Sequence, residues 1–298
     1  MKMLPCNKIR NPMMKKSEPV ENLTNVVKNI QAQPALHVVT FATDESRLVY
    51  LKQSCKNSGL EITIIMKPSW NGYQDKILYI KEFLQNIPET DIVCFVDAYD
   101  VLGLSDKDEI LKKFYSFNCE LVIGAELNCY PGQNKQQYPQ LEYSTNYNYV
   151  NSGGYIGYKR AISKMFNWKP LNDVLSMCSD ESGTDQNYVT LYYISNYLTD
   201  NILLDRECNI FQNMHLVDWN EIYFRNGRVV NKILDKTPCF LHFNGGVFWN
   251  HDRTINIMPV IIEKLQDTRN NSNVLNLKQY SQLITETCFP NSQIDTGE

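Results

Sequence analysis

The sequence predicts an α/β fold in which helices cover a mostly parallel central sheet. Short apolar runs of strand length alternate with amphipathic segments, which is the arrangement that βαβ units produce. The run Ile92–Val96 is rich in β-branched and aromatic residues and predicts a strand buried on both faces. Two carboxylates, Asp97 and Asp100, follow it, at the place where open α/β sheets bind their ligands. The fold class and the expected position of the functional site therefore rest on the same segment.

The composition excludes several classes of partner. The 298 residues can bury a substantial core, enough for one large or two small domains. The net charge of −4 provides no basic surface for nucleic acid, and no apolar stretch reaches the roughly 20 residues that span a membrane. Residues 1–16 are basic but contain no apolar core. We therefore expect residues 1–34 to be a disordered leader and not a secretory signal peptide.

The cysteines point to a reducing compartment. There are nine, and none forms a C-x-x-C pair, which argues against a structural zinc site. An odd number of cysteines without a signal peptide favours free thiols and a cytoplasmic location.

The first half of the chain alternates strands and helices. Leu36–Ala42 predicts a buried strand, and the helix after it is expected over 44–58, where a glycine follows as a cap. A second strand over 61–66 and a helix over 74–86 lead to the central strand. This order of elements favours parallel strands joined by helices.

After the central strand the pattern changes. A string at 105–108 resembles a capping box and opens a helix that ends near Phe117. Residues 128–148 are rich in Tyr, Asn, Gln and Pro, which predicts an ordered surface loop. The other expected elements are a strand over 121–125, a glycine-interrupted strand over Tyr149–Tyr158, a helix over 185–197, a strand over 239–246, and a polar tail from 269 to 298 with a short helix near 275–283.

The residues that could bind a metal each allow two interpretations. Asp97 and Asp100 offer the hard oxygen ligands that Mg²⁺ or Mn²⁺ uses to hold a phosphate-bearing substrate, or they only form a turn and cap a helix. His242 lies in an apolar run, where an imidazole is either a core residue or a ligand through one ring nitrogen. The other histidines are expected in the core (His37) or at the surface (His215 and His251).

Several polar and aromatic residues elsewhere in the sequence also allow two interpretations each. The string Asn-Ser-Gly-Gly at 151–154 predicts either a strand bulge or a backbone surface for sugar hydroxyls, with Asn151 as donor and acceptor. Lys76, in the first turn of its helix, is either solvated or a phosphate contact. Four aromatic residues either pack inside loops or form a platform for sugar rings or a peptide: Trp70, Tyr130, Tyr143 and Tyr147.

Seven motifs occur in an order that resembles one known family. They are Phe-Val-Asp-Ala-Tyr-Asp at 95–100, Ala-Glu-Leu-Asn-Cys-Tyr-Pro at 125–131, Asn-Ser-Gly-Gly-Tyr-Ile-Gly at 151–157, Asp-Gln at 185–186, Leu-Asp at 204–205, Ile-Phe-Gln-Asn at 210–213 and His-x-Asn-Gly at 242–245. Together they resemble the glycosyltransferase domain of procollagen lysyl hydroxylases over about residues 36–246. A composition rich in Asn, Ile and Tyr is also similar to the free-standing giant-virus members of this group.

The resemblance implies a GT-A fold over residues 35–268, with a Rossmann-like nucleotide-binding half fused to an acceptor-binding half. It implies Mn²⁺ and a UDP-sugar, with UDP-glucose as the expected donor. The implied acceptor is galactosylhydroxylysine of a collagen-like peptide or glycopeptide, glycosylated with retention of configuration. A galactosyltransferase acting on hydroxylysine and a non-catalytic collagen-binding module stay open as alternatives, and so does a homodimer. A phosphohydrolase fits less well, because Asp97-Ala-Tyr-Asp100 lacks the D-x-D spacing of such enzymes.

Motif matches with the family assign roles residue by residue. The implied metal ligands are Asp97, Asp100 and His242. The implied donor-binding residues are Thr40, Trp70, Lys76, Tyr99, Asn244 and Gly245, with Tyr99 stacked on uracil. The residues implied nearest the chemistry are Asp185, Asn151 and Glu126, of which Asp185 contacts the transferred sugar or the attacking hydroxyl.

The chain departs from the family pattern at three places. Only 185–186 match an aspartate-rich string of the family, so Asp180 and Glu181 receive no role. Tyr130 stands where the family has a tryptophan, and 246–249 replace a proline and a nearby lysine, so a phosphate contact has to come from elsewhere, for example Arg253. The H-x-D motif of a hydroxylase iron site is absent from the sequence, so we do not expect hydroxylation.

The loop over 128–147 is predicted to bind the acceptor. The first three strands and Tyr99 account for the nucleotide, and a metal at Asp97 and Asp100 holds the diphosphate. The sugar must then project toward the segment that follows the strand over 121–125, and that segment is this loop.

Overall fold

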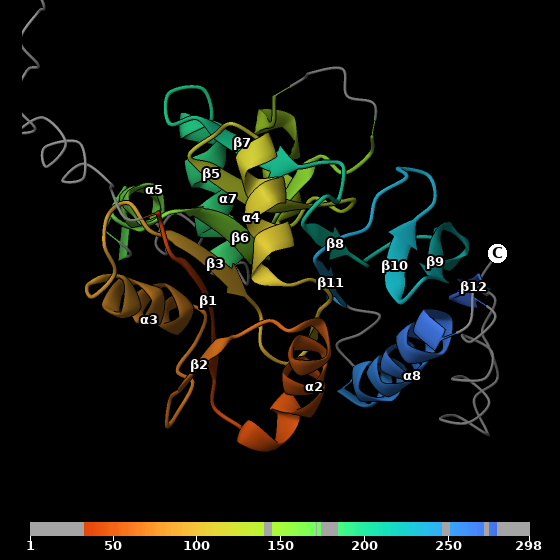
Figure 1. Cartoon of the computed structure of the whole chain (residues 1–298). Coiled ribbons are helices and arrows are strands. Elements are labelled where there is room, and N and C mark those ends of the chain that lie inside the picture. The colour runs from red at the N-terminus through yellow and green to blue at the C-terminus, as the bar shows by residue number, and fades with distance from the viewer. Residues whose placement is uncertain are drawn as a thin grey trace, which may run out of the picture. The chain divides into compact units, whose positions relative to one another are not determined.

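The computed structural model describes residues 33–139, 145–170, 172–173, 184–245, 251–270 and 274–278 (Figure 1). Side chains are described from Ile257 onward in the last helix. The predicted leader up to residue 32, the aromatic residue Tyr143, the pair Asp180 and Glu181, the Arg253 side chain and the tail beyond residue 278 therefore lie outside the described part.

A six-stranded sheet forms the centre, and it confirms the predicted mostly parallel α/β fold. The strand order is β2-β1-β3-β6-β5-β7, and only β6 runs against its two neighbours. β1 pairs in parallel with β2 and β3, and β5 pairs in parallel with β7. The strands are β1 Leu36–Ala42, β2 Thr63–Met66, β3 Ile92–Val96, β5 Leu121–Glu126, β6 Tyr149–Tyr158 and β7 Ile202–Asp205.

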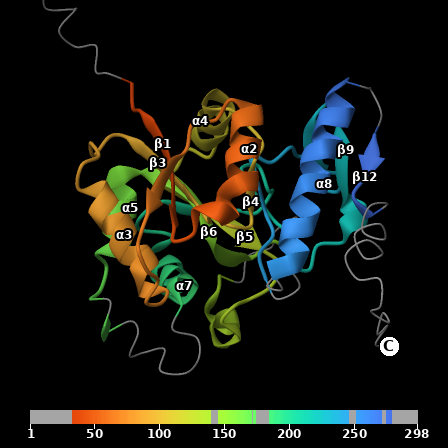
Figure 2. The same cartoon turned by 90° about the horizontal axis from the view of Figure 1, so that it is seen from below.

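Helices cover both faces of this sheet, because its inner strands bury alternate residues on opposite sides. In β3, Val93 and Phe95 join one core cluster, whereas Ile92, Cys94 and Val96 join the other. Figure 2 shows α3, α5 and α7 on the first side and α2 and α4 on the second. Their bounds are α2 Val49–Ser58, α3 Gln74–Leu84, α4 Lys107–Ser116, α5 Lys159–Phe166 and α7 Asp185–Asn196.

The helix ends carry the capping residues that the sequence predicts, except that the N-cap of one helix is displaced by one residue. Gly59 caps α2 with a left-handed backbone, φ 70°, as the sequence predicts. The expected capping box at 105–108 is displaced by one residue, because Asp106 is the N-cap of α4 and its carboxylate accepts from the Glu109 backbone N–H at 2.9 Å. Asp44 caps a short 3₁₀ turn, Glu45–Leu48, that leads into α2.

A second sheet sits at the carboxyl end of β3. Its order is β4-β11-β8, with β11 antiparallel to β4 and parallel to β8. The bounds are β4 Val101–Gly103, β8 Phe211–Asn213 and β11 Phe240–His242. Only four residues separate β3 from β4, so the chain turns sharply through Asp97–Asp100 between the two sheets.

A third sheet, β10-β9-β12, packs against α8 (Figures 1 and 2). Its strands are β9 Ile222–Arg225, β10 Arg228–Asn231 and β12 Leu275–Asn276, and α8 spans His251–Asn270. The helix expected near 275–283 is wrong at its start, because Leu275 and Asn276 pair with β9 as a strand. No helix among the described residues is both long and apolar enough to cross a membrane.

The predicted surface loop over 128–148 is partly a core element. It contains the 3₁₀ helix Gly132–Gln137, and both Tyr138 and Tyr147 are buried in the first core cluster. Tyr147 also accepts a hydrogen bond from the Gln212 amide at 3.0 Å. Of the two interpretations of its aromatic residues, packing within the fold therefore holds for Tyr147.

Candidate active site

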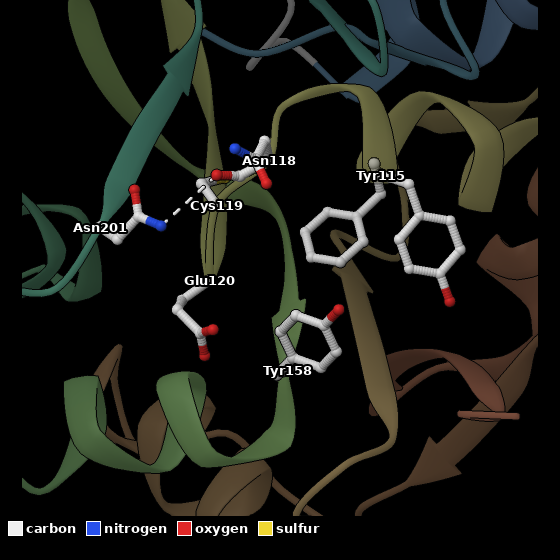
Figure 3. A pocket seen from close by; sticks show the side chains of 7 residues that line it. Tyr115, Asn118, Cys119, Glu120, Tyr158 and Asn201 are labelled. Carbon is white, nitrogen blue, oxygen red and sulfur yellow. Dashed lines mark hydrogen bonds between the residues drawn. The ribbon is translucent and has the colours of Figure 1, made fainter. Parts of the chain in front are cut away.

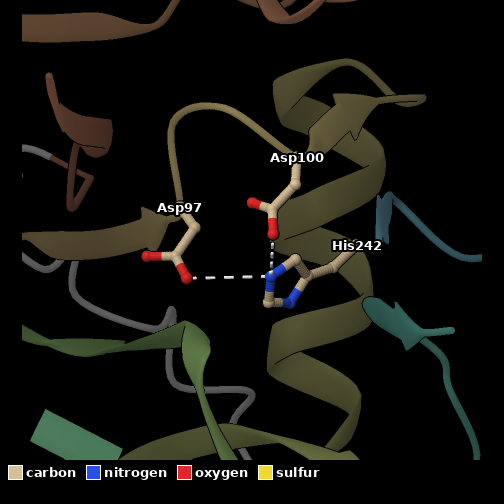
Figure 4. Close-up of side chains that lie close together, drawn as sticks. All are labelled: Asp97, Asp100 and His242. Atoms are coloured by element: carbon tan, nitrogen blue, oxygen red, sulfur yellow. Dashed lines mark ion pairs between the residues drawn. The ribbon is translucent and has the colours of Figure 1, made fainter. Parts of the chain in front are cut away.

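Three side chains that could hold a metal ion converge where the first and second sheets meet (Figure 4). Asp97 and Asp100 occupy the turn between β3 and β4, and His242 ends β11, directly opposite Val101 of β4. Its Nε2 lies 3.7 Å from an Asp97 oxygen and 3.4 Å from an Asp100 oxygen. In the part of the chain that the structure describes, this is the one group of three such ligands within 4.8 Å of one another.

The hydrogen bonds around His242 direct the correct nitrogen toward the carboxylates. Asn213 donates from its amide nitrogen to the Ala125 carbonyl at 2.9 Å, which turns its oxygen toward His242. That oxygen accepts from Nδ1 of His242 at 2.8 Å, so the proton belongs on Nδ1 and the lone pair of Nε2 faces Asp97 and Asp100. Metal-bound histidines are usually oriented in this way, so the donor set fits a divalent cation.

The charges of the two aspartates also shift the pKa of the His242 ring. Burial lowers the pKa of His242, but the charges of Asp100 and Asp97 outweigh burial and raise the pKa above its usual value. The carboxylates thus create a negative potential at Nε2, which favours any cation that binds between these three groups.

Gly153 provides the space in which two of the predicted metal ligands, His242 and Asp97, approach the backbone of β6. A Cβ at this position would lie 2.2 Å from Cε1 of His242 and 2.7 Å from an Asp97 oxygen. The Gly153 carbonyl also accepts from the Asp97 backbone N–H at 2.9 Å, which fixes the start of the turn. Of the two interpretations of the string 151–154, the structure shows the strand bulge, because the pairing with β5 jumps from Tyr155 opposite Ile123 to Asn151 opposite Gly124. The backbone surface for sugar hydroxyls stays a prediction, and the close approach described here is toward the predicted metal ligands.

Lys76 links the predicted metal ligands to Asp185. Its Nζ lies 2.7 Å from an Asp97 oxygen and 2.9 Å from an Asp185 oxygen. Lys76 comes from the start of α3 and Asp185 from the start of α7, so two helices on the same face deliver the pair. Burial lowers the pKa of Lys76, but Asp185 and Asp97 outweigh it and raise the pKa, so the amine stays charged.

Glu126, at the end of β5, is the centre of a buried polar network. Its carboxylate accepts from the amides of Asn151 at 3.1 Å, Gln186 at 2.8 Å and Asn244 at 2.8 Å. Burial is the largest influence and raises the pKa of Glu126, although these amides and His242 oppose the shift. Four segments that are far apart in the sequence are thereby held together at the carboxyl edge of the sheet.

These groups surround a cavity of about 340 Å³. Nearly all residues that the resemblance singles out line it, namely Lys76, Asp97, Asp100, Glu126, Asn151, Asp185, His242, Asn244 and Gly245. Residues without a predicted role line it too, including Tyr73, Gly153, Gln186 and His215. The expectation that His215 lies at the surface is wrong, since it is half-buried and faces this cavity. The signal for it was its place two residues after the 210–213 motif.

Three residues with predicted donor roles lie outside the cavity lining. Thr40 is fully buried, and its hydroxyl has no hydrogen-bond partner among the described residues. Tyr99 is fixed to the end of β1, because its hydroxyl accepts from the Thr43 backbone N–H at 2.7 Å, and the Arg47 guanidinium covers one face of its ring at 3.8 Å. Trp70 is 46% exposed. Their roles in binding a base stay predictions.

A second, smaller cavity of about 170 Å³ lies at the opposite edge of the sheet (Figure 3). It is lined by Phe114, Tyr115, Asn118, Cys119, Glu120, Tyr158 and Asn201, near the amino ends of β5 and β7. The Asn201 amide donates to the Asn118 carbonyl at 3.5 Å, and Arg160 pairs with Glu120 through two bonds of 2.8 Å. No residue with a predicted role lines this cavity.

The fold and the cavity at the carboxyl edge define a GT-A-like glycosyltransferase domain. The family model of the PLOD GT domain matches residues 32–265, which is most of the chain. The chain therefore belongs to the PLOD GT domain family, as its motifs predict.

Several curated proteins are similar to the chain. An uncharacterized protein of Acanthamoeba polyphaga mimivirus is 29% identical over 203 residues, covering 64% of this chain and 41% of the relative. The multifunctional procollagen lysine hydroxylase and glycosyltransferase of Caenorhabditis elegans is 29% identical over 233 residues, covering 71% and 30%. Human procollagen-lysine,2-oxoglutarate 5-dioxygenase 1 is 30% identical over 227 residues, covering 70% and 30%. The match thus spans less than half of each of these relatives.

Proposed function

We propose that the chain is a metal-dependent glycosyltransferase that moves a sugar from a UDP-sugar to a collagen-like acceptor. In its specific form the proposal is transfer of glucose from UDP-glucose to galactosylhydroxylysine, with Mn²⁺ and with retention of configuration. The observation that carries it is the meeting of Asp97, Asp100 and His242 at one wall of a cavity that also holds Lys76 and Asp185. Membership of the PLOD GT domain family and the names of the relatives support the acceptor class.

The predicted ligands would hold the cation, and the neighbouring residues would organise the donor. A divalent cation bound there acts as a Lewis acid for the negative charge that develops on the departing diphosphate. Lys76 bridges Asp97 and Asp185 and so fixes both carboxylates before substrate binds. Preorganised charges of this kind supply much of the stabilisation of a transition state.

Asp185 is the residue that we place nearest the transferred sugar or the attacking hydroxyl. It is buried, begins α7 and keeps one oxygen on Lys76 at 2.9 Å, which leaves the other oxygen for substrate. Asn151, Asn244 and Glu126 would line the sugar, because Glu126 holds both amides in place. On the nucleotide side we place Tyr99, Thr40, Trp70 and Gly245.

A screen of UDP-sugars tests the proposal directly. Each sugar nucleotide is incubated with the chain and Mn²⁺, with and without galactosylhydroxylysine or hydroxylysine collagen peptides, and the release of UDP is measured. We expect release with UDP-glucose that rises with the galactosylated peptide and stops when EDTA removes the metal. UDP-galactose with the bare hydroxylysine peptide as the preferred pair would replace the glucosyl assignment. Acceptor binding without turnover of any UDP-sugar would favour a non-catalytic binding module.

A further inference from the structure

The turn that follows β8 has an unfavourable backbone at an exposed residue. The Val217 backbone N–H donates to the Met214 carbonyl at 3.2 Å, which closes a four-residue turn with His215 and Leu216 in the middle. Leu216 has a φ of 63°, although its Cβ disfavours this left-handed region, and its side chain is 62% exposed. Burial of Leu216 therefore does not account for the conformation. Strain kept at the rim of a cavity is often linked to function.

This turn delivers His215 into the cavity and fixes it there. The His215 backbone N–H donates to the Asn244 side-chain oxygen at 3.1 Å, and its ring packs against Gly245, where a Cβ would lie 2.1 Å from Nδ1. β8 and β11 run in parallel with Asn213 opposite His242, so His215 lies beside Asn244, two residues beyond the level of the predicted metal ligand. The ring is thus next to the space that a ligand on the metal would fill.

The surroundings of the ring define its hydrogen-bonding role. Nδ1 of His215 is enclosed and has no hydrogen-bond partner among the described residues. An enclosed nitrogen without an acceptor is a poor place for a proton, so the neutral ring keeps its proton on Nε2. Burial lowers the pKa of His215, which favours this neutral form. His215 is therefore a hydrogen-bond donor through Nε2.

The rest of the cavity lining indicates what this donor would meet. Four carboxylates line the cavity, and the network of Glu126, Lys76 and Asp185 is already hydrogen-bonded. Because an anionic group with several acceptor oxygens has no donors of its own, it gains most from an unused N–H donor. A sugar hydroxyl gains less, since it can donate to the many carboxylates.

We propose that His215 donates a hydrogen bond from Nε2 to the terminal phosphate of the nucleoside diphosphate, both in the donor and in the departing product. This inference rests on the proposed function and extends it to a residue for which the motifs assign no role. It makes His215 a binding residue for the leaving group and the strained Leu216 the element that holds His215 in place.

Calorimetric titration with UDP and UMP tests the inference, with Mn²⁺ present throughout. In His215→Ala we expect UDP to bind about tenfold more weakly, because a bond to a charged acceptor is lost, and UMP to change by less than about twofold. His215→Gln retains an N–H donor and should recover most of the UDP affinity. His37→Ala is the control, since His37 pairs with Asp91 at the other edge of the sheet.

Each outcome is informative. Unchanged UDP affinity in His215→Ala, or equal weakening of UDP and UMP, would overturn the inference and leave the proposed function intact. Failure of the wild-type chain to bind UDP with Mn²⁺ would overturn the proposed function and the inference together. A second readout uses the wild-type chain alone: with Mg²⁺, UDP should shift the ring nitrogen resonances of His215 and UMP should not, and the opposite result also overturns the inference.

Discussion

The two edges of the central sheet both carry polar side chains, but they use them differently. At the carboxyl edge, Asp185 and Glu126 are almost fully buried, and side chains from several distant segments hold them. At the amino edge, the Glu120–Arg160 pair is partly exposed, so it contributes little to stability. The amino-edge polar groups close turns, whereas the carboxyl edge keeps charges in place at a cost in desolvation. Buried charge, and not polarity alone, distinguishes the candidate active site from the second cavity.

Substitutions of the predicted metal ligands should give the largest difference in activity between the two edges of the sheet. We expect Asp97→Ala or Asp100→Ala to reduce Mn²⁺-dependent turnover of UDP-sugar on the order of a thousandfold, because the cation loses a ligand. Turnover and Mn²⁺ affinity are measured together, with Glu120→Ala as the amino-edge control. Full activity of either aspartate variant at saturating Mn²⁺ would remove the metal assignment.

Two glycine substitutions test the shape of the predicted metal site without changing a predicted ligand. In Gly153→Ala the new methyl group collides with His242 and Asp97, so we expect metal affinity to fall roughly 10- to 100-fold. Gly132→Ala is the matched control, because a Cβ there meets nothing within 4 Å. Mn²⁺ binding is followed by calorimetry. If both variants bind the metal equally well, Gly153 does not shape the site.

Two exposed tyrosines test whether the acceptor binds at the carboxyl edge. Tyr130 lines the larger cavity and is 43% exposed, and Tyr115 lines the smaller one and is 46% exposed. We expect Tyr130→Ala to slow transfer to a collagen peptide about fivefold to tenfold, through loss of stacking, and to leave hydrolysis of the donor by water unchanged. Tyr115→Ala should alter neither rate. Equal losses of transfer and hydrolysis in Tyr130→Ala would assign Tyr130 to the donor side.

The smallest expected effect concerns backbone strain. Asn118, at the amino edge, has a φ of 49°, which asparagine tolerates, whereas Leu216, at the carboxyl edge, has a φ of 63°. Leu216→Gly should therefore raise the free energy of unfolding by about 1 kcal/mol. Asn118→Gly should change it by only a few tenths of a kcal/mol. Urea unfolding measures both variants, and equal shifts would show that no strain is concentrated at the active-site edge.

Local sequence patterns were sufficient for five of the six strands of the central sheet, all but β7, and for two of the three predicted metal ligands. The strands β1, β3 and β5 follow from apolar runs, and Asp97 and Asp100 lie next to the strand that positions them. The approach of His242 could not be read from local patterns, because it depends on the pairing of β11 with β4 across more than a hundred residues. For that ligand the order of motifs in the family supplied the information.

Other elements were missed as well, and three features have a clear physical cause: α8, β12 and the direction of β6. α8 was not predicted because Pro259 interrupts its helical pattern, and β12 is too short for any periodicity to show. The direction of β6 could not be read from its own residues, since the antiparallel strand β6 and the parallel strand β3 are both buried nearly throughout. The role of Gly153 depends on which atoms lie above it, and that is known only once the sheets have met.

The position of the antiparallel strand β6 determines when the central sheet can close as the chain is synthesised. Among the described strands it alone lies between β3 and β5, so each of these two strands keeps an open, apolar edge until residues up to Tyr158 have been synthesised. The same strand carries Gly153, against which the Asp97 turn and His242 settle. Because β11, which carries His242, follows β6 and β7 along the chain, the predicted metal site can form only after all strands of the central sheet have been made. Tight binding of the metal would then report that a newly made chain has completed its sheet.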